Sequence, residues 1–101
     1  GHRHDSKTEA VRCNELHDEQ AAGVISDIVV HPKYWFWING VQLKHPGGRR
    51  IGITADWAYL DNTTGATVVE DRKGMRTRDY VLRVAIFRAL YPEIEFRETR
   101  A

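Results

Sequence analysis

Apolar residues recur at helical spacing in two stretches of the chain. The first covers residues 6–22 and ends before Gly23, a residue type that commonly terminates helices. The second begins after Thr77, which favours a helix N-cap, and ends at Pro92. Its apolar stripe consists of Tyr80, Val84, Phe87 and Tyr91. The pattern therefore predicts two amphipathic helices, one near each end of the chain.

Strand-like segments fill the chain between and after these helices. Residues 24–30, 33–38 and 41–43 are apolar or aromatic, and Asn39-Gly40 favours a tight hairpin. Residues 51–60 alternate regularly and predict one strand, which returns as residues 66–73 after a turn at 61–65. Residues 93–98 follow a crossover helix and should pair in parallel with the strand before them. The order α-β-β-β-β-α-β predicts an α+β (α/β) fold, a mixed sheet flanked by two helices. We expect residues 1–101 to form one domain.

Composition narrows the class of protein without indicating an activity. The net charge is +1, with 42% hydrophobic and 29% charged residues, which is ordinary for a globular protein. The single cysteine, Cys13, excludes an internal disulfide and a zinc site of several cysteines, and favours a cytoplasmic location. No apolar run is long enough to cross a membrane, so we expect no membrane partner. A net charge near zero neither requires nor excludes nucleic acid.

The strand before the second helix carries the most specific chemistry, because it ends in Asp71 and Lys73. If the preceding turn is centred between Thr63 and Thr64, Asp56 lies directly opposite Asp71, and Lys73 shares their face. Two carboxylates at this spacing repel each other unless a cation neutralises them. A register displaced by one residue would instead send the two acids to opposite faces.

A divalent cation fits this arrangement of acids. Carboxylate oxygens are the ligands that Mg²⁺ and Mn²⁺ prefer. A cation held by Asp56 and Asp71 would activate a water and offset the charge of a phosphodiester. Lys73 would steady the attacking water or the developing negative charge. These residues predict a metal-dependent nuclease site.

Two other acids have competing interpretations. Glu9, one turn into the first helix, is a further candidate ligand, but a capping box with Ser6 explains it equally well. Glu70 should lie on the face opposite Asp71, beside Arg72, which predicts a structural ion pair. Glu70 becomes the metal ligand only if the register of the turn is displaced.

The chain resembles the DUF1064 group of small phage and prophage proteins within the PD-(D/E)XK nuclease superfamily. The matching stretches are residues 5–10, 25–27 through 32–33, 54–59, 68–74 with Thr77, and 91–96. The resemblance implies a restriction-endonuclease-like αβββαβ core and Mg²⁺- or Mn²⁺-dependent cleavage of DNA. It makes Asp56 the first acid of the motif, Asp71 the second, Lys73 the lysine and Glu9 an added helical acid.

The same resemblance suggests a biological setting and shows two departures. The superfamily includes restriction enzymes, Holliday-junction resolvases and recombination nucleases, so phage DNA recombination or replication in the host cytoplasm is expected. Ala55 replaces the usual proline before the first acid, and His31 stands where glutamine would be expected before Pro32. His31 is a candidate for contacting metal or DNA, although a hydrogen-bonded structural histidine is the favoured interpretation.

Basic residues are the candidates for holding DNA. They are Lys44, Arg49 and Arg50 in a glycine-rich loop, and Arg72, Arg76 and Arg78 around the start of the second helix. Such side chains contact phosphates without reading bases, which favours recognition of DNA structure, such as a branch or junction, over sequence. An exposed aromatic strip among residues 34–37 would favour a homodimer. The alternatives are a DNA-binding or phage accessory protein that does not cut, and a structural protein that its cation merely stabilises.

Overall fold

The computed structural model describes residues 7–73 and 76–100, with side chains for residues 9–72 and 76–99. The elements in chain order are α1 (Lys7–Ala21), β1 (Ile25–Val30), β2 (Lys33–Trp35), β3 (Trp37–Ile38), β4 (Val41–Gln42), β5 (Gly52–Thr54), β6 (Trp57–Asp61), β7 (Thr67–Lys73), α2 (Arg78–Leu90) and β8 (Glu95–Arg100). Four strands form the main sheet in the order β1-β6-β7-β8. β8 runs parallel to β7, as predicted, and the other neighbours are antiparallel.

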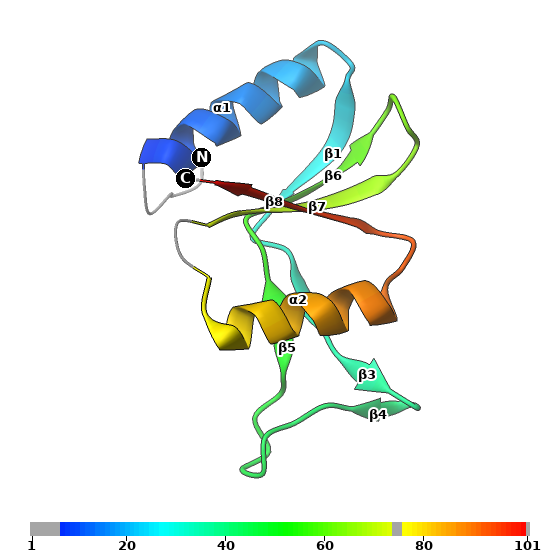
Figure 1. The fold of residues 1–101 in the computed structure, drawn as a ribbon. Helices are drawn as coiled ribbons and strands as arrows, with labels where there is room; N and C mark the ends of the chain where they lie inside the picture. The colour runs from blue at the N-terminus through cyan, green and yellow to red at the C-terminus, as the bar shows by residue number, and fades with distance from the viewer. Residues whose placement is uncertain (1–6, 74–75, 101) are drawn as a thin grey trace.

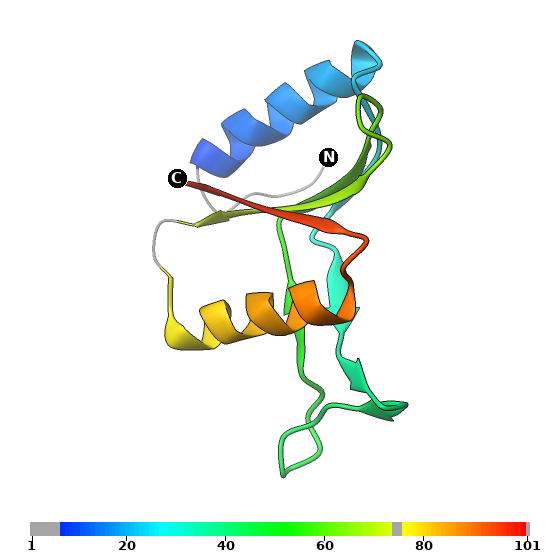
Figure 2. The ribbon, with the colours of Figure 1, turned by 45° about the vertical axis from the view of Figure 1, so that its right-hand side comes forward.

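The two helices cover opposite faces of this sheet (Figures 1 and 2). Cys13 and Leu16 of α1 pack with Trp57, Tyr59 and Val68 in one buried cluster. On the other face, the α2 residues Val84 and Phe87 pack with a second cluster that includes Ala58, Val69 and Phe96. Burying each large side chain stabilises the fold by roughly 1.5–3 kcal/mol. The predicted mixed sheet flanked by two helices is confirmed.

The continuous strand predicted over residues 51–60 is wrong, because the chain bends at Ala55 and Asp56 between β5 and β6. Ile53 and Ala55 pack with the cluster on the α2 face, whereas Trp57 packs with the cluster on the α1 face. Regular alternation would have put all three side chains on one face. The bend resolves this conflict and divides the predicted strand into β5 and β6, and residues 33–38 are likewise divided into β2 and β3.

Residues 33–54, which precede the bend in the chain, form a two-stranded arm that leaves the main sheet (Figure 1). β2 pairs with β5, and β3 pairs with β4 through the predicted Asn39-Gly40 turn, where both residues have positive φ. The basic segment after β4, predicted as a glycine-rich loop, is a turn closed by backbone contacts. The His45 N–H donates to the Arg49 carbonyl at 2.8 Å, and Lys44 bridges to Arg50.

The second helix begins where the sequence predicts. Thr77 is its N-cap, and the Thr77 hydroxyl accepts a hydrogen bond from the Tyr80 N–H at 3.1 Å. Neither of the two described helices is long and apolar enough to span a bilayer.

Candidate metal centre

The register of β6 and β7 places Asp56 opposite Asp71. The last paired residues are Trp57 and Glu70, and Asp56 and Asp71 come next along the two strands. The Asp56 N–H donates to the Glu70 carbonyl at 3.2 Å, and the Arg72 N–H donates to Asp56 Oδ2 at 2.7 Å. The register predicted from a turn centred between Thr63 and Thr64 is therefore confirmed.

A β-bulge in β1 brings His31 opposite Asp56. The register between β1 and β6 shifts between Ser26 and Val29, where Asp27 has a φ of 56°. After the bulge Val30 faces Trp57, and the His31 N–H donates to the Asp56 carbonyl at 2.9 Å. Without the extra residue, Val30 would have faced Asp56 instead. Bulges of this kind often re-aim a side chain beside a functional site.

The backbone of His31 is itself unusual. Its φ is 54°, in the left-handed region, and the following residue is Pro32, which restricts it further. Strained residues of this kind cluster at functional sites. The imidazole is exposed and makes no hydrogen bond with any described residue. The favoured interpretation of His31 as a hydrogen-bonded structural histidine therefore has no side-chain hydrogen bond among the described residues to support it.

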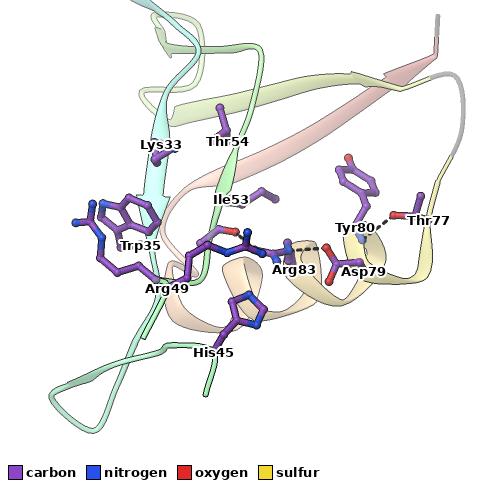
Figure 3. A pocket seen from close by; sticks show the side chains of 12 residues that line it. Lys33, Trp35, His45, Arg49, Ile53, Thr54, Thr77, Asp79, Tyr80 and Arg83 are labelled. Atoms are coloured by element: carbon purple, nitrogen blue, oxygen red, sulfur yellow. Dashed lines mark hydrogen bonds and ion pairs between the residues drawn. The ribbon is translucent and has the colours of Figure 1, made fainter. Parts of the chain in front are cut away.

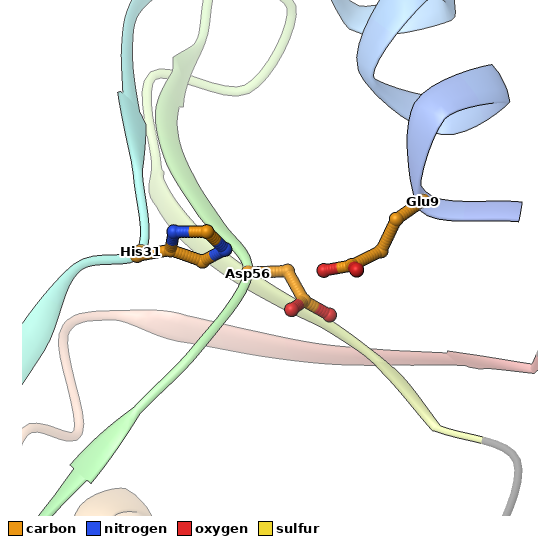
Figure 4. Close-up of side chains that lie close together, drawn as sticks. All are labelled: Glu9, His31 and Asp56. Atoms are coloured by element: carbon orange, nitrogen blue, oxygen red, sulfur yellow. The ribbon is translucent and has the colours of Figure 1, made fainter. Parts of the chain in front are cut away.

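Helix α1 supplies the third member of the cluster. Glu9 lies in its first turn, only 9% exposed, and its carboxylate points toward Asp56 (Figure 4). One ligand atom each from Glu9, His31 and Asp56 lies within 4.8 Å of the others. The alternative role of Glu9 in a capping box depends on Ser6, which lies outside the described residues.

The same row of residues continues across the sheet beyond Asp56. Asp71, 2% exposed, neighbours Glu98 of β8 in the parallel ladder, and Glu98 pairs with Arg76 at 3.1 Å. Burial raises the pKa of Tyr80 on α2, and hydrogen bonding with Glu98 and the charge of Asp71 raise it further. Glu98 was not among the predicted site residues. Its place depends on the parallel register of β7 and β8, which the sequence does not specify.

The surroundings of Asp56 raise its proton affinity. Burial, hydrogen bonding with Glu9 and the neighbouring charge of Asp71 together raise the pKa of Asp56 to about 8. The hydrogen bond from the Arg72 N–H acts in the opposite direction. In the absence of a cation, the Asp56 carboxyl therefore holds a proton at neutral pH. A bound cation would replace that proton.

The separations within the cluster fit a small divalent cation. Ligands on opposite sides of Mg²⁺ or Mn²⁺, each about 2.1 Å from the ion, are about 4.2 Å apart, and adjacent ligands are closer. The three ligand atoms, all within 4.8 Å of one another, would move closer together around a bound ion. Glu9, His31 and Asp56 would hold the ion, with Asp71 beside Asp56.

Glu70 has a structural role on the other face of β7. Its carboxylate, 1% exposed, accepts hydrogen bonds from Arg12 Nε at 2.7 Å and from the Tyr59 hydroxyl at 2.7 Å. Burial and this hydrogen bond raise the pKa of Tyr59 to about 12. The predicted structural ion pair is confirmed, but the partner is Arg12 of α1 rather than Arg72.

The remaining predicted residues lie in different surroundings. Lys73 ends β7, and its side chain lies outside the described part of the chain. Arg72 is half-buried, Arg76 is engaged with Glu98, and Arg78 is exposed at the start of α2. The three basic residues of the arm, Lys44, Arg49 and Arg50, are exposed.

Together, the fold and the site define an α+β protein with a carboxylate and imidazole cluster at one end of its sheet. The model of a family described as protein of unknown function (DUF1064) matches residues 1–100. The chain therefore belongs to the DUF1064 family. No curated protein and no solved structure matches the chain.

Proposed function

We propose that this protein is a divalent-metal-dependent DNA endonuclease that selects branched or junction DNA. The observation that carries the proposal is the row of His31, Asp56 and Asp71 at the sheet end, closed by Glu9 from α1. Two helices around a mixed sheet with a parallel last strand agree with the nuclease core that the sequence resemblance implies. The expected setting is phage DNA recombination or replication in the host cytoplasm.

The residues of the cluster divide the tasks of hydrolysis, in which a water oxygen bonds to phosphorus and one sugar oxygen leaves. Glu9, Asp56 and Asp71 provide the negative charge that binds the cation. The Arg72 N–H fixes Asp56 Oδ2, so that carboxylate needs little reorganisation. When bound, the cation would lower the pKa of a water and offset charge on the phosphodiester. Lys73, by the sequence prediction, would steady the attacking water.

The imidazole of His31 influences the preference of the site for one cation over another. Carboxylates suit Mg²⁺ and Mn²⁺ alike, but imidazole is a softer ligand that suits transition metals better than Mg²⁺. A site that combines Glu9 and Asp56 with His31 should therefore favour Mn²⁺ over Mg²⁺.

A panel of DNA substrates tests this function. The protein is incubated with supercoiled plasmid, linear duplex, single-stranded DNA and a four-way junction, each with Mg²⁺, Mn²⁺ or EDTA. We expect cleavage with either cation, none in EDTA, and cleavage of the junction at protein concentrations that leave linear duplex intact. Binding without cleavage of any substrate, at high protein concentration and with both cations, would show a DNA-binding protein rather than a nuclease.

A further inference from the structure

A pocket of about 440 Å³ opens beside the arm, between β2, β5 and the start of α2. Its lining includes Lys33 and Trp35 of β2, Arg49 and Arg50 of the closed turn, and Arg83 of α2 (Figure 3). The volume falls within the range of small-ligand sites, about 300–1,000 Å³, and suffices for one nucleotide. None of these side chains belongs to the metal centre described above.

The pocket carries positive charge that the protein does not neutralise. Arg83 is fixed within the protein, because it donates to the Gly52 carbonyl at 2.6 Å and pairs with Asp79 at 2.7 Å. Asp79 is the one carboxylate among the described lining residues. No described carboxylate pairs with Lys33, Arg49 or Arg50. Clustered like charges without a counter-charge favour binding of an anion.

Trp35 gathers two of these charges around its indole ring. The Arg50 guanidinium lies 4.1 Å from the ring centroid, and Lys33 Nζ lies 5.0 Å from it. Gly52 makes this packing possible, since a Cβ there would lie 3.0 Å from the Trp35 ring and 2.2 Å from the Tyr34 carbonyl oxygen. A half-buried indole with cations over its ring combines the aromatic surface and positive charge that bind bases and phosphates of single-stranded nucleic acid.

The arm connects this pocket to the metal centre in a fixed register. His31 faces Asp56, and two residues further along the same two strands Lys33 pairs with Thr54. Trp35 pairs with Gly52 two residues beyond that. At about 3.3 Å per residue, Lys33 lies about 7 Å and Trp35 about 13 Å from the centre along the arm. Stacked nucleotides rise about 3.4 Å each, so Trp35 lies about four nucleotides away, and fewer when the strand is extended.

We propose that this pocket binds an unpaired nucleotide of the DNA, two to four nucleotides from the scissile phosphate. Lys33, Arg49 and Arg50 hold its phosphate, and its base stacks on Trp35 or on the outer face of the Arg50 guanidinium. A base within a duplex cannot enter, because it is paired and stacked. The inference rests on the proposed nuclease function. It identifies the DNA feature that would distinguish a branch from a plain duplex, which is a single-stranded tail beside the cut.

Binding to labelled DNA in EDTA tests the pocket separately from cleavage. The probes are fluorescein-labelled duplexes carrying single-stranded dT tails of zero to about eight nucleotides. For the wild type, we expect the affinity for these duplexes to rise with tail length up to about four nucleotides and then to level off. Trp35→Ala should weaken binding of the duplex with a long tail by about 5- to 150-fold, and its affinity for the blunt duplex should stay within twofold of the wild type.

Three further variants complete the test. Arg50→Ala should also remove most of the dependence of affinity on tail length. Arg88→Ala is a matched control outside the pocket, because Arg88 likewise lies over an aromatic ring, that of Phe96. Trp35→Phe, which keeps an aromatic platform, should retain most of the binding, and Trp35→Leu replaces Trp35→Ala if the alanine variant fails to fold. The proposal is overturned if Arg50→Ala and a folded Trp35 variant lacking the aromatic ring bind duplexes of every tail length as the wild type does.

The two proposals fail in different ways. Binding that depends on tail length, without cleavage under any metal condition, would support the pocket and overturn the nuclease function. If the wild type cleaves DNA in a metal-dependent way but Arg50→Ala binds tailed duplexes unchanged, the nuclease function is supported and the pocket is overturned.

Discussion

Asp56→Asn should have opposite effects on stability in the absence and presence of a divalent cation. The substitution keeps the shape of the side chain, and its amide oxygen can still accept the 2.7 Å hydrogen bond from the Arg72 N–H. It removes the ionisable carboxyl that lies against Glu9 and Asp71. A residue whose only role is structural would not produce such a reversal.

The magnitude follows from the pKa of Asp56, which the fold raises from 3.8 to about 8. A folded-state pKa above the unfolded value means that the folded protein holds the proton more tightly. The stability from this group is complete below about pH 4 and is lost as the pH rises to about 8. Each pKa unit corresponds to about 1.36 kcal/mol, but this carboxyl is only half-buried and water screens much of the effect, so we expect about 2 kcal/mol.

Thermal unfolding measured from pH 5 to pH 9 in EDTA and in Mn²⁺ checks this prediction. In EDTA, Asp56→Asn should be the more stable protein at pH 8, by about 10 °C in Tm, and the difference should shrink toward pH 5. Mn²⁺ at about a hundred times its Kd should stabilise the wild type by about 2.7 kcal/mol and the variant hardly at all. The order of stability then reverses.

Asp18→Asn is the matched control, because Asp18 is exposed on α1 away from the cluster. It should follow the wild type under every condition. The reasoning is refuted if Asp56→Asn shows the wild-type dependence on pH in EDTA, or if Mn²⁺ stabilises it as much as it stabilises the wild type.

Three further substitutions test separate parts of the structure. His31→Ala should reduce activity with Mn²⁺ more than activity with Mg²⁺, measured as the ratio of initial cleavage rates; an unchanged ratio would remove His31 from the site. Arg12→Met should lower the free energy of unfolding by about 3–5 kcal/mol in urea, because it leaves the buried Glu70 carboxylate without its cation; a loss below about 1 kcal/mol would contradict this. Gly52→Ala should cost about 1–3 kcal/mol, because its Cβ would lie 2.2 Å from the Tyr34 carbonyl oxygen; an unchanged Tm would show that the arm adapts.

The sequence was sufficient to predict the pairing of the two acids. The turn at residues 61–65 has turn-forming residues throughout, and the flanking strands alternate around it, so its centre fixed the register that brings Asp56 opposite Asp71. The second helix was equally accessible, because Thr77 and Pro92 mark its two ends. These features depend on residues close together in the chain.

The features that the sequence did not predict depend on contacts between distant segments. The pairing of Glu70 with Arg12, rather than with the adjacent Arg72, requires α1 to lie across β7. His31 reaches the cluster only because of the bulge at Asp27, where no glycine or proline marks an irregular strand. The bend at residues 55–56 was hidden by regular alternation, since Ile53, Ala55 and Trp57 continue the apolar positions of one face through it.

Cleavage of a four-way junction by site variants tests the central claim most directly. Single-turnover rates are measured with saturating Mn²⁺ for the wild type, Asp56→Asn, Asp71→Asn and the control Asp18→Asn. The proposed centre predicts metal-dependent cleavage by the wild type and Asp18→Asn, and losses on the order of a hundredfold or more for the other two. Cleavage at the wild-type rate by Asp56→Asn and Asp71→Asn would contradict the assignment of this cluster as the catalytic centre.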